Sequence, residues 1–290
     1  MPRCGTIVLA GRPNVGKSTL LNALIGERLA IVSAKPQTTR LPVIGVRTEE
    51  DAQLVFVDPP GLLEPRYLLH EAMLEKATVA LRQADAILRL HPADEEPWPA
   101  TPREGSPVPL PDRPTLLVLA KADLLARPRS SSLAPDRLLV SAQTGQGIPE
   151  LLAWCRAHLP ESPFCYDPEY SSTQPQRFFA AEFVREAAFA QLGDELPYAL
   201  AVEVDEFREH SEPVYIRAII FVERDSQKAM VIGKDGRMIK SLGAEARSAI
   251  EGFLGARVYL DLWVKVLPKW RSRADALQRF GFSVPTSRHA

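Results

Sequence analysis

The stretch Gly11–Gly26 reads GRPNVGKSTLLNALIG and directly follows the apolar run Thr6–Ala10. Its first eight residues fit the pattern GxxxxGK[ST], in which two glycines let the backbone wrap around phosphate groups. The run before it has the composition of a buried strand, and the residues after it have that of a helix. A strand, a glycine-rich loop and a helix in this order predict a phosphate-binding site at the positive end of the helix.

Residues of this loop and of a second motif have the chemistry to hold phosphate and a metal ion. Lys17 is expected to reach the terminal phosphates, and the Ser18 hydroxyl is expected to bind Mg²⁺. Downstream, the sequence DPPG ends an apolar strand. Its aspartate, Asp58, is expected to hold the metal through a water molecule, and the N–H group of Gly61 is expected to face a γ-phosphate. The loop residues expected to contact the nucleotide are Gly11, Asn14, Val15, Gly16, Lys17, Ser18 and Thr19.

Overall composition excludes several classes of protein. The 290 residues include 35 basic and 36 acidic side chains, so the net charge of −1 indicates no general attraction to nucleic acid. The three cysteines, Cys4, Cys155 and Cys165, have neither CxxC nor metal-site spacing, which indicates buried or incidental thiols in a reducing compartment. No apolar run approaches the roughly 20 residues that span a bilayer, and the N-terminus lacks a signal-peptide pattern. We therefore expect a cytosolic protein.

The first half of the chain alternates strand-like and helical patterns. Candidate strands are 6–10, 43–46, 53–58, 85–90, 115–120 and 138–142, and candidate helices follow Gly16 and cover about 66–82 and 149–158. Such alternation predicts an α/β domain, here 1–160, with a doubly wound, mostly parallel sheet. One stretch, 91–114, contains eight prolines and is expected to form an irregular surface excursion. A linker is expected over 161–176, where turn residues replace the apolar period.

The second half predicts a smaller α+β module over 177–268, followed by a tail, 269–290. A helix near 178–192 precedes two alternating strands, 199–207 and 214–223, and helical sequence surrounds a glycine pair before the last strand, 257–266. In that last strand Val258 and every second residue after it point one way, and Tyr259, Asp261, Trp263 and Lys265 point the other.

The glycine pair lies in Ile232-Gly233-Lys234-Asp235-Gly236-Arg237, which fits the GXXG loop of KH domains of type II. Such a loop lets the protein backbone approach that of a nucleic acid and clamps about four nucleotides. Twelve basic and six acidic residues between Arg217 and Arg273 give an excess of six positive charges, which favours phosphate contact. Val231, Ile232 and Ile239 are expected to line the groove. The residues expected to bind RNA are Ile232, Gly233, Lys234, Asp235, Gly236, Arg237, Lys240, Lys265, Lys269 and Arg271.

Together with GRPNVGKSTLLNALIG, the motifs KPQTTR, DPPG, SAQTGQG and VIGKDGRMIKSLGAEAR resemble those of the translation-factor-like GTPases, and among them the Era family. The resemblance covers most of the chain except 91–114 and the tail. It implies GTP or GDP with Mg²⁺ as ligand, Thr39 as the switch threonine that binds Mg²⁺ beside Ser18 and Asp58, and Asn14 as the loop asparagine that helps some relatives use K⁺. Leu62 follows Gly61 where a glutamine could orient water, so we expect slow intrinsic hydrolysis by the set Lys17, Ser18, Thr39 and Gly61.

Base recognition departs from the family pattern N-K-x-D, because the chain has Ala120-Lys121-Ala122-Asp123. Asp123 can still accept both N–H groups of the guanine Watson–Crick edge, and the Lys121 stem can lie on the ring. Within SAQTGQG, Ser141 and Ala142 complete the expected base site, with the Ala142 N–H on guanine O6. We expect weakened guanine binding rather than a change to adenine, because adenine presents a lone pair to Asp123 and an amino group to Ala142.

The resemblance implies a GTP-binding and GTP-hydrolysing protein that binds small-subunit (16S) rRNA near its 3′ end and assists assembly of the 30S ribosomal subunit. It further implies peripheral contact with the inner face of the cell membrane, and we expect a monomer. Two other readings stay open. In one, the protein is an RNA-binding assembly scaffold whose nucleotide domain is degenerate, weakly guanine-binding or inactive; in the other, it is a P-loop ATPase acting on RNA.

Overall fold

The computed structural model describes residues 1–33, 35–127, 130–193 and 195–283. They form two compact units, each with its own sheet and core. Unit 1 consists of Met1–Ala30, Thr39–Arg66 and His70–Thr173; unit 2 consists of Ile31–Thr38, Tyr67–Leu69 and the chain from Gln174 onward.

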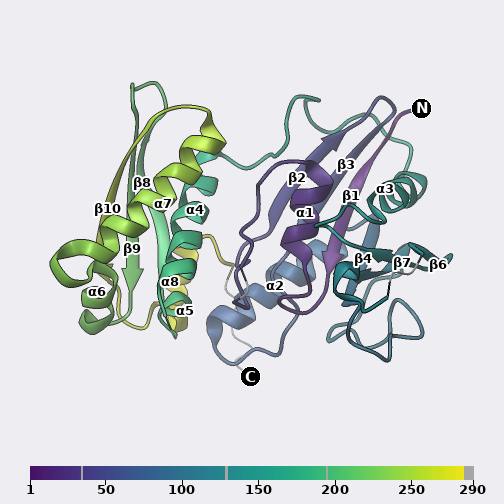
Figure 1. Cartoon of the computed structure of the whole chain (residues 1–290), viewed down its shortest axis with the longest axis horizontal. Helices are drawn as coiled ribbons and strands as arrows, with labels where there is room; N and C mark the ends of the chain where they lie inside the picture. Colours follow the sequence, from purple (N-terminus) through teal and green to yellow (C-terminus); the bar gives the residue numbers. More distant parts are fainter. Residues whose placement is uncertain (34, 128–129, 194, 284–290) are drawn as a thin grey trace. The chain divides into compact units, whose positions relative to one another are not determined.

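Within the described residues, unit 1 contains a seven-stranded sheet of order β2-β3-β1-β4-β5-β7-β6 (Figure 1). The strands are β1 (Arg3–Ala10), β2 (Val43–Thr48), β3 (Ala52–Asp58), β4 (Ala86–Pro92), β5 (Thr115–Ala120), β6 (Ser132–Ala134) and β7 (Arg137–Val140). The five central strands pair in parallel, and β2 and β6 run antiparallel at the two edges. The predicted mostly parallel sheet is therefore confirmed.

Helices cover both faces of this sheet. They are α1 (Lys17–Ile25), α2 (Leu68–Arg82), α3 (Ile148–Ala157) and the short 3₁₀ helix η1 (Ala122–Leu124). On one face Val57 of β3 packs in a cluster with Ala77 and Leu81 of α2. On the other face Gly45, which pairs with the residue before Val57, lies against Ile25 of α1. Because neighbouring residues of a strand point to opposite faces, α1 and α2 flank the sheet in the doubly wound manner.

The proline-rich segment is irregular, as predicted, but it covers part of the core instead of only looping over the surface. Beyond the end of β4 at Pro92, no helix or strand is formed before β5. Trp98 packs on a buried cluster of β5 and β7 residues and donates its indole N–H to the Ala93 carbonyl at 2.9 Å. Val108 and Leu110 pack against the α2 cluster. Arg103 donates to the Leu110 carbonyl at 2.9 Å, so the segment supplies its own hydrogen bonds without a helix.

Unit 2 is built on a three-stranded sheet of order β10-β9-β8, with β9 and β10 parallel. Its helices α4 and α7 pack against each other and against the sheet (Figure 1). The elements in chain order are α4 (Gln176–Gln191), α5 (Leu196–Ala199), β8 (Ala201–Arg208), β9 (Val214–Val222), α6 (Asp225–Ile232), η2 (Lys234–Gly236), α7 (Arg237–Leu254), β10 (Val258–Val266), η3 (Trp270–Ser272) and α8 (Ala274–Arg279).

The expected alternation of the last strand is present, and the beginning of the tail folds onto unit 2. In β10, Val258 and Val264 are buried, whereas Tyr259 and Trp263 are exposed. After this strand, Trp270 is fully buried and donates its indole N–H to the Ala199 carbonyl at 2.8 Å. In the part of the chain that the structure describes, no helix combines the length and apolarity needed to cross a bilayer.

Replacing Trp270 tests whether the start of the tail stabilises unit 2. Trp270→Ala should lower the free energy of unfolding of this unit by about 3–5 kcal/mol, because it leaves a large cavity and an unpaired Ala199 carbonyl. Trp263→Ala, which removes an indole that is 53% exposed, should cost less than about 1 kcal/mol. Urea unfolding followed by circular dichroism measures both. Equal losses in the two variants would contradict a structural role for Trp270.

Candidate functional site

The glycine-rich loop joins β1 to α1 at the carboxyl end of the parallel sheet. Gly16 precedes α1 with φ of 103°, and Asn14 has φ of 61°. A positive φ near 100° is open to glycine and strained for other residues, which explains the need for glycine at position 16. Lys17 is 6% exposed, and its Nζ lies 3.2 Å from the Arg12 carbonyl and 3.4 Å from that of Gly11. The ammonium group is thus held over the loop that is expected to receive phosphates.

The three residues expected to bind Mg²⁺ converge. Ser18 donates its hydroxyl to Oδ2 of Asp58 at 2.6 Å, and Thr39 donates to the same oxygen at 3.3 Å. The two hydroxyl oxygens are 3.0 Å apart. These side chains come from α1, from the segment before β2 and from the end of β3, so only folding brings them together.

The chemistry of this cluster fits a cation. Asp58 is fully buried, and its second oxygen, Oδ1, has no hydrogen-bond partner among the described residues. A buried carboxylate oxygen without a partner is costly unless a cation or donor binds it. Burial raises the pKa of Asp58, against the opposing effect of the Lys17 charge, and burial lowers the pKa of Lys17. Hard oxygen ligands of this kind suit Mg²⁺.

Gly61 and Leu62 both lie against the phosphate loop through their backbone, and the Leu62 side chain turns away from it into the core. A Cβ atom on Gly61 would be 2.7 Å from the Pro13 nitrogen, so the close approach of the two segments requires glycine. The Leu62 N–H donates to the Gly11 carbonyl at 3.0 Å. Its side chain is 2% exposed and packs in the α2 cluster with Val8 and Ala10. Leu62 therefore offers no polar group at the site where a water molecule would attack.

A cavity of about 230 Å³ adjoins the phosphate loop at the ends of β5 and β7. Its walls include Ala120, Lys121, Asp123 and Ala142, four residues of the expected base site. It is also lined by Gly16, Thr19, Leu20, Leu124, Val140 and Gln143. At position 120 only a methyl group borders this space, where the family pattern has an asparagine.

Ser141, also expected in the base site, is fully buried and not part of the cavity wall. Its hydroxyl donates to Oδ1 of Asp123 at 2.5 Å and accepts from the Thr144 N–H at 3.2 Å. The first hydrogen bond restrains the Asp123 carboxylate, and the second holds the Ser141 hydroxyl in place to make it. Ser141 is therefore a positioning residue for Asp123.

Arg89 near the phosphate loop was not expected from the sequence. It lies on β4, is 3% exposed, and donates to the carbonyls of Leu90 at 2.6 Å and Gly105 at 3.1 Å. Its charge adds to the lowering of the Lys17 pKa. Arg89 thus connects the proline-rich segment to β4, near the carboxyl ends of the strands where the phosphate loop lies. The sequence did contain a sign of this role, because an arginine inside an otherwise apolar strand must find buried hydrogen-bond partners.

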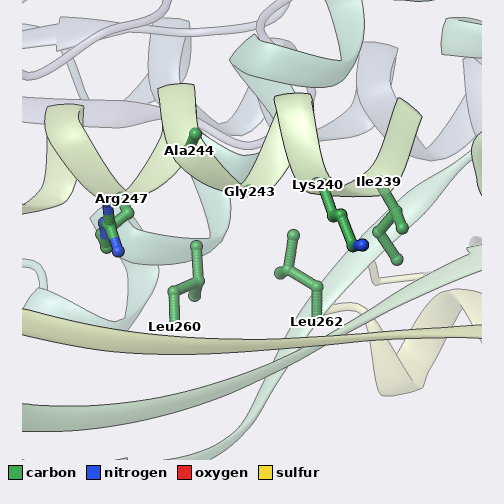
Figure 2. Close-up of a pocket in the computed structure, with 7 residues that line it drawn as sticks. All are labelled: Ile239, Lys240, Gly243, Ala244, Arg247, Leu260 and Leu262. Carbon is green, nitrogen blue, oxygen red and sulfur yellow. The ribbon is translucent and has the colours of Figure 1, made fainter. Parts of the chain in front are cut away.

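Unit 2 has a groove of about 310 Å³ between α7 and β10 (Figure 2). Leu260 and Leu262 rise from β10 towards α7, while Lys240 and Arg247 lie near the two ends. Gly243, between them, has no side chain to fill the space. An apolar floor with cations at its ends suits unstacked bases and the phosphates that join them.

The sequence identified only part of this groove. Ile239 and Lys240 line it, but two other residues expected there do not: Val231 is fully buried in the core, and Ile232 is not part of the groove wall. The residues missed are Gly243, Ala244, Arg247, Leu260 and Leu262. Their signal is present, because the α7 residues repeat at the helical spacing of four and the β10 residues at the strand spacing of two.

The GXXG loop immediately precedes the groove. Gly233 has φ of 71°, and a Cβ there would lie 2.6 Å from that of Met238, so only glycine allows the chain to turn into α7. Lys234, Asp235 and Arg237 are exposed on this loop, and Ile232 and Gly236 are partly exposed. An exposed GXXG loop that leads into a groove leaves its backbone accessible to a ligand.

Three expected RNA contacts lie elsewhere. Lys265 is on the face of β10 opposite Leu260 and Leu262, as the alternation requires. Lys269 is exposed beyond the strand, and Arg271 is half-buried with its guanidinium on Glu223 at 2.6 Å. The structure therefore does not bring these three side chains into the groove.

The loop, the buried lysine and the carboxylate–hydroxyl cluster define unit 1 as a P-loop nucleotide-binding domain, and the GXXG loop within α4–β10 defines unit 2 as a KH module. Family models agree: that of the 50S ribosome-binding GTPase matches residues 6–121, and that of the KH domain matches 195–271. GTPase Era of Carboxydothermus hydrogenoformans is 40% identical, over 97% of this chain and 98% of the relative. GTPase Era of Geobacter metallireducens is 39% identical, over 97% and 98%.

Solved structures give the same result. A crystal structure of Era in complex with MgGDPNP and nucleotides 1506–1542 of 16S ribosomal RNA matches with a TM-score of 0.89 and 34% identity, over 97% of this chain and 99% of that one. A crystal structure of a single-substitution variant of Aquifex aeolicus Era, bound to GDP and aluminium fluoride, matches with a TM-score of 0.85 and 34% identity, over 96% of this chain and 99% of that one. This chain belongs to the Era family of GTPases.

Proposed function

We propose that this protein binds GTP and GDP with Mg²⁺, hydrolyses GTP slowly, and binds 16S rRNA near its 3′ end through the KH module during assembly of the 30S subunit. The observation that carries the nucleotide part is Oδ1 of buried Asp58, which has no hydrogen-bond partner in the described part of the chain and lies beside the hydroxyl groups of Ser18 and Thr39. Support for the RNA part comes from the groove beside the GXXG loop and from the related Era structure that holds MgGDPNP and 16S rRNA nucleotides.

Each residue of the nucleotide site has a proposed role. Ser18, Thr39 and Asp58 hold Mg²⁺, which neutralises charge on the phosphate oxygens when it is bound. Lys17 stabilises negative charge on the terminal phosphates, and the N–H of Gly61 donates to the γ-phosphate. Asn14 is proposed to assist a K⁺ ion on the basis of family resemblance.

Turnover tests the enzymatic part of the proposal. Wild-type protein should release phosphate from GTP in buffer with Mg²⁺ and K⁺, and Lys17→Ala should lower the rate about 100-fold or more, because it removes a cation that stabilises the transition state. Lys76→Ala, on the α2 helix, is the matched lysine control and should retain the wild-type rate. Wild-type and Lys17→Ala rates that coincide would favour the alternative, an RNA-binding assembly scaffold with a degenerate nucleotide domain. The buried, apolar Leu62 is the observation that favours this alternative.

Base selectivity depends on Ala120 and Asp123. Ala120→Asn should tighten GDP binding about ten- to hundred-fold, because the restored amide gives the base a hydrogen bond worth about 1–3 kcal/mol. Asp123→Asn should lower the affinity for GDP and raise that for XDP, since the amide can donate to the xanthine oxygen. Calorimetric titration with GDP, ADP and XDP measures these affinities. Equal affinity of the wild type for ADP and GDP would instead support the P-loop ATPase.

The RNA groove is tested by filling it. Gly243→Leu should weaken binding of a single-stranded RNA about tenfold or more, because the new side chain occupies the space above Leu262, from which a Cβ at 243 would be 3.3 Å away. Gly252→Leu is the matched control, since a Cβ there meets no atom within 4 Å. Fluorescence anisotropy with labelled RNA gives both affinities. RNA binding that survives Gly243→Leu would exclude this groove as the site.

Other parts of the proposal carry over from the sequence. Composition and patterning give the division into 1–160, 161–176, 177–268 and 269–290 and a place in the cytoplasm, and a monomer is expected. The family resemblance gives peripheral contact at the inner face of the membrane. In the RNA-binding set we retain Ile232, Gly233, Lys234, Asp235, Gly236, Arg237 and Lys240, and propose that Lys265, Lys269 and Arg271 contact RNA only outside the groove.

A further inference from the structure

Two thiols that are 161 residues apart in the chain meet in unit 1. The Sγ atom of Cys4 lies 2.9 Å from that of Cys165 and 3.6 Å from Oε1 of Gln53. Cys4 is on β1 and is 2% exposed, whereas Cys165 is exposed on the segment that follows α3. The two sulfur atoms are therefore in direct contact, and Cys165 is accessible to reagents in solution.

Gln53 holds Cys165 in this place. Its Oε1 accepts from the N–H groups of Cys165 at 2.8 Å and Tyr166 at 2.9 Å, and its Nε2 donates to the Tyr166 carbonyl at 2.9 Å. Gln53 is fully buried and pairs directly with Cys4 in the sheet. The segment that carries Cys165 is therefore fixed by three hydrogen bonds next to the Cys4 side chain, and a bond between the sulfur atoms requires little movement of the backbone.

We propose that Cys4 and Cys165 are a reversible disulfide site, oxidised by exchange with a low-molecular-weight disulfide such as oxidised glutathione. In the first step the Cys165 thiolate attacks the glutathione disulfide, forms a mixed disulfide and releases one reduced glutathione. In the second step Cys4 loses its proton, attacks Sγ of Cys165 and releases the second reduced glutathione. The protein loses two electrons and two protons, and one disulfide of the oxidant is reduced to two thiols.

Exposure sets the order of these steps. Cys165 meets the oxidant first, because Cys4 is enclosed and its burial, together with the hydrogen bond to Cys165, raises the pKa of its thiol to about 11. Cys4 then reacts because the mixed disulfide forms next to it, which raises its effective concentration. In a reducing compartment the two cysteines would remain thiols and would form the disulfide only under oxidising conditions. Disulfides of cytosolic proteins are usually transient in this way.

The disulfide would tie down the start of the segment that leads to unit 2. Further along, this segment is held by hydrogen bonds from the Val46 N–H to the Ser171 carbonyl at 2.8 Å and from the Ser172 hydroxyl to the Ile44 carbonyl at 2.5 Å. In the oxidised protein, the disulfide would attach the segment that carries Cys165 covalently to β1, and reduction would release it. It would also close a long loop through unit 1 and so stabilise that unit against unfolding.

Thiol counting on the full chain tests the proposal. After incubation with millimolar oxidised glutathione and removal of the reagent, denatured protein should show one free thiol instead of three, and a non-reducing peptide map should join the peptides of Cys4 and Cys165. Under the same treatment Cys155→Ala should fall from two thiols to none, because Cys155 is fully buried and takes no part. The melting temperature of unit 1 should rise on oxidation in both proteins and return with a reducing agent.

Cys165→Ser is the redox-inactive control, and its two thiols and its melting temperature should not change. Three thiols left in the oxidised wild type would overturn the proposal. So would a stable glutathione adduct on Cys165 with Cys4 still free, or a covalent dimer through Cys165. Each of these results leaves the nucleotide and RNA proposals untouched, since neither uses these cysteines.

Discussion

The nucleotide site that we propose for unit 1 depends on keeping an ammonium group and a carboxylate out of water beside the carboxyl ends of two adjacent parallel strands. Lys17 and Asp58 are both buried, and burial opposes the charge on each. Charges in such a place persist only when opposite charges and hydrogen bonds compensate them. Here the compensation comes from their mutual attraction and from the hydroxyl groups on Asp58. It is incomplete, because Oδ1 of Asp58 has no hydrogen-bond partner among the described residues, and a carboxylate oxygen of this kind suits a metal ion.

The groove of the KH module depends on a position without a side chain, whereas the site in unit 1 depends on buried charges. Its groove exists because Gly243 adds nothing to the face of α7 that lies above Leu260 and Leu262. Lys240 and Arg247 then place positive charge near the two ends of an apolar floor, as Figure 2 shows. A groove of this shape suits bases by packing and phosphates by charge, so we expect its affinity for RNA to rest on apolar surface and electrostatics together.

Three departures from the family pattern meet around the nucleotide site. Ala120 leaves a methyl group on the wall of the base cavity, and Leu62 turns into the core instead of towards the site. The proline-rich segment covers the face of the sheet beside α2 without forming a helix, and Arg89 fastens it through the Gly105 carbonyl. Phosphate and metal residues nevertheless converge. We therefore expect the departures to affect base affinity and water activation more than phosphate binding.

By itself the sequence determined the strand–loop–helix of the phosphate site and the GXXG loop, because these features are local in the chain and have fixed spacing. It predicted the mostly parallel sheet from the alternation of strand and helix patterns, because neighbouring parallel strands need a crossover connection. Tertiary structure alone decided what depends on distant contacts. Ser141 turned out to orient Asp123, Val231 to lie in the core, and Trp270 to extend the fold of unit 2 into the tail. The contact between Cys4 and Cys165 was also decided by tertiary structure. Only the pairing of β1 with β3 and the hydrogen bonds of Gln53 bring these two residues together, and their separation in the sequence gives no sign of it.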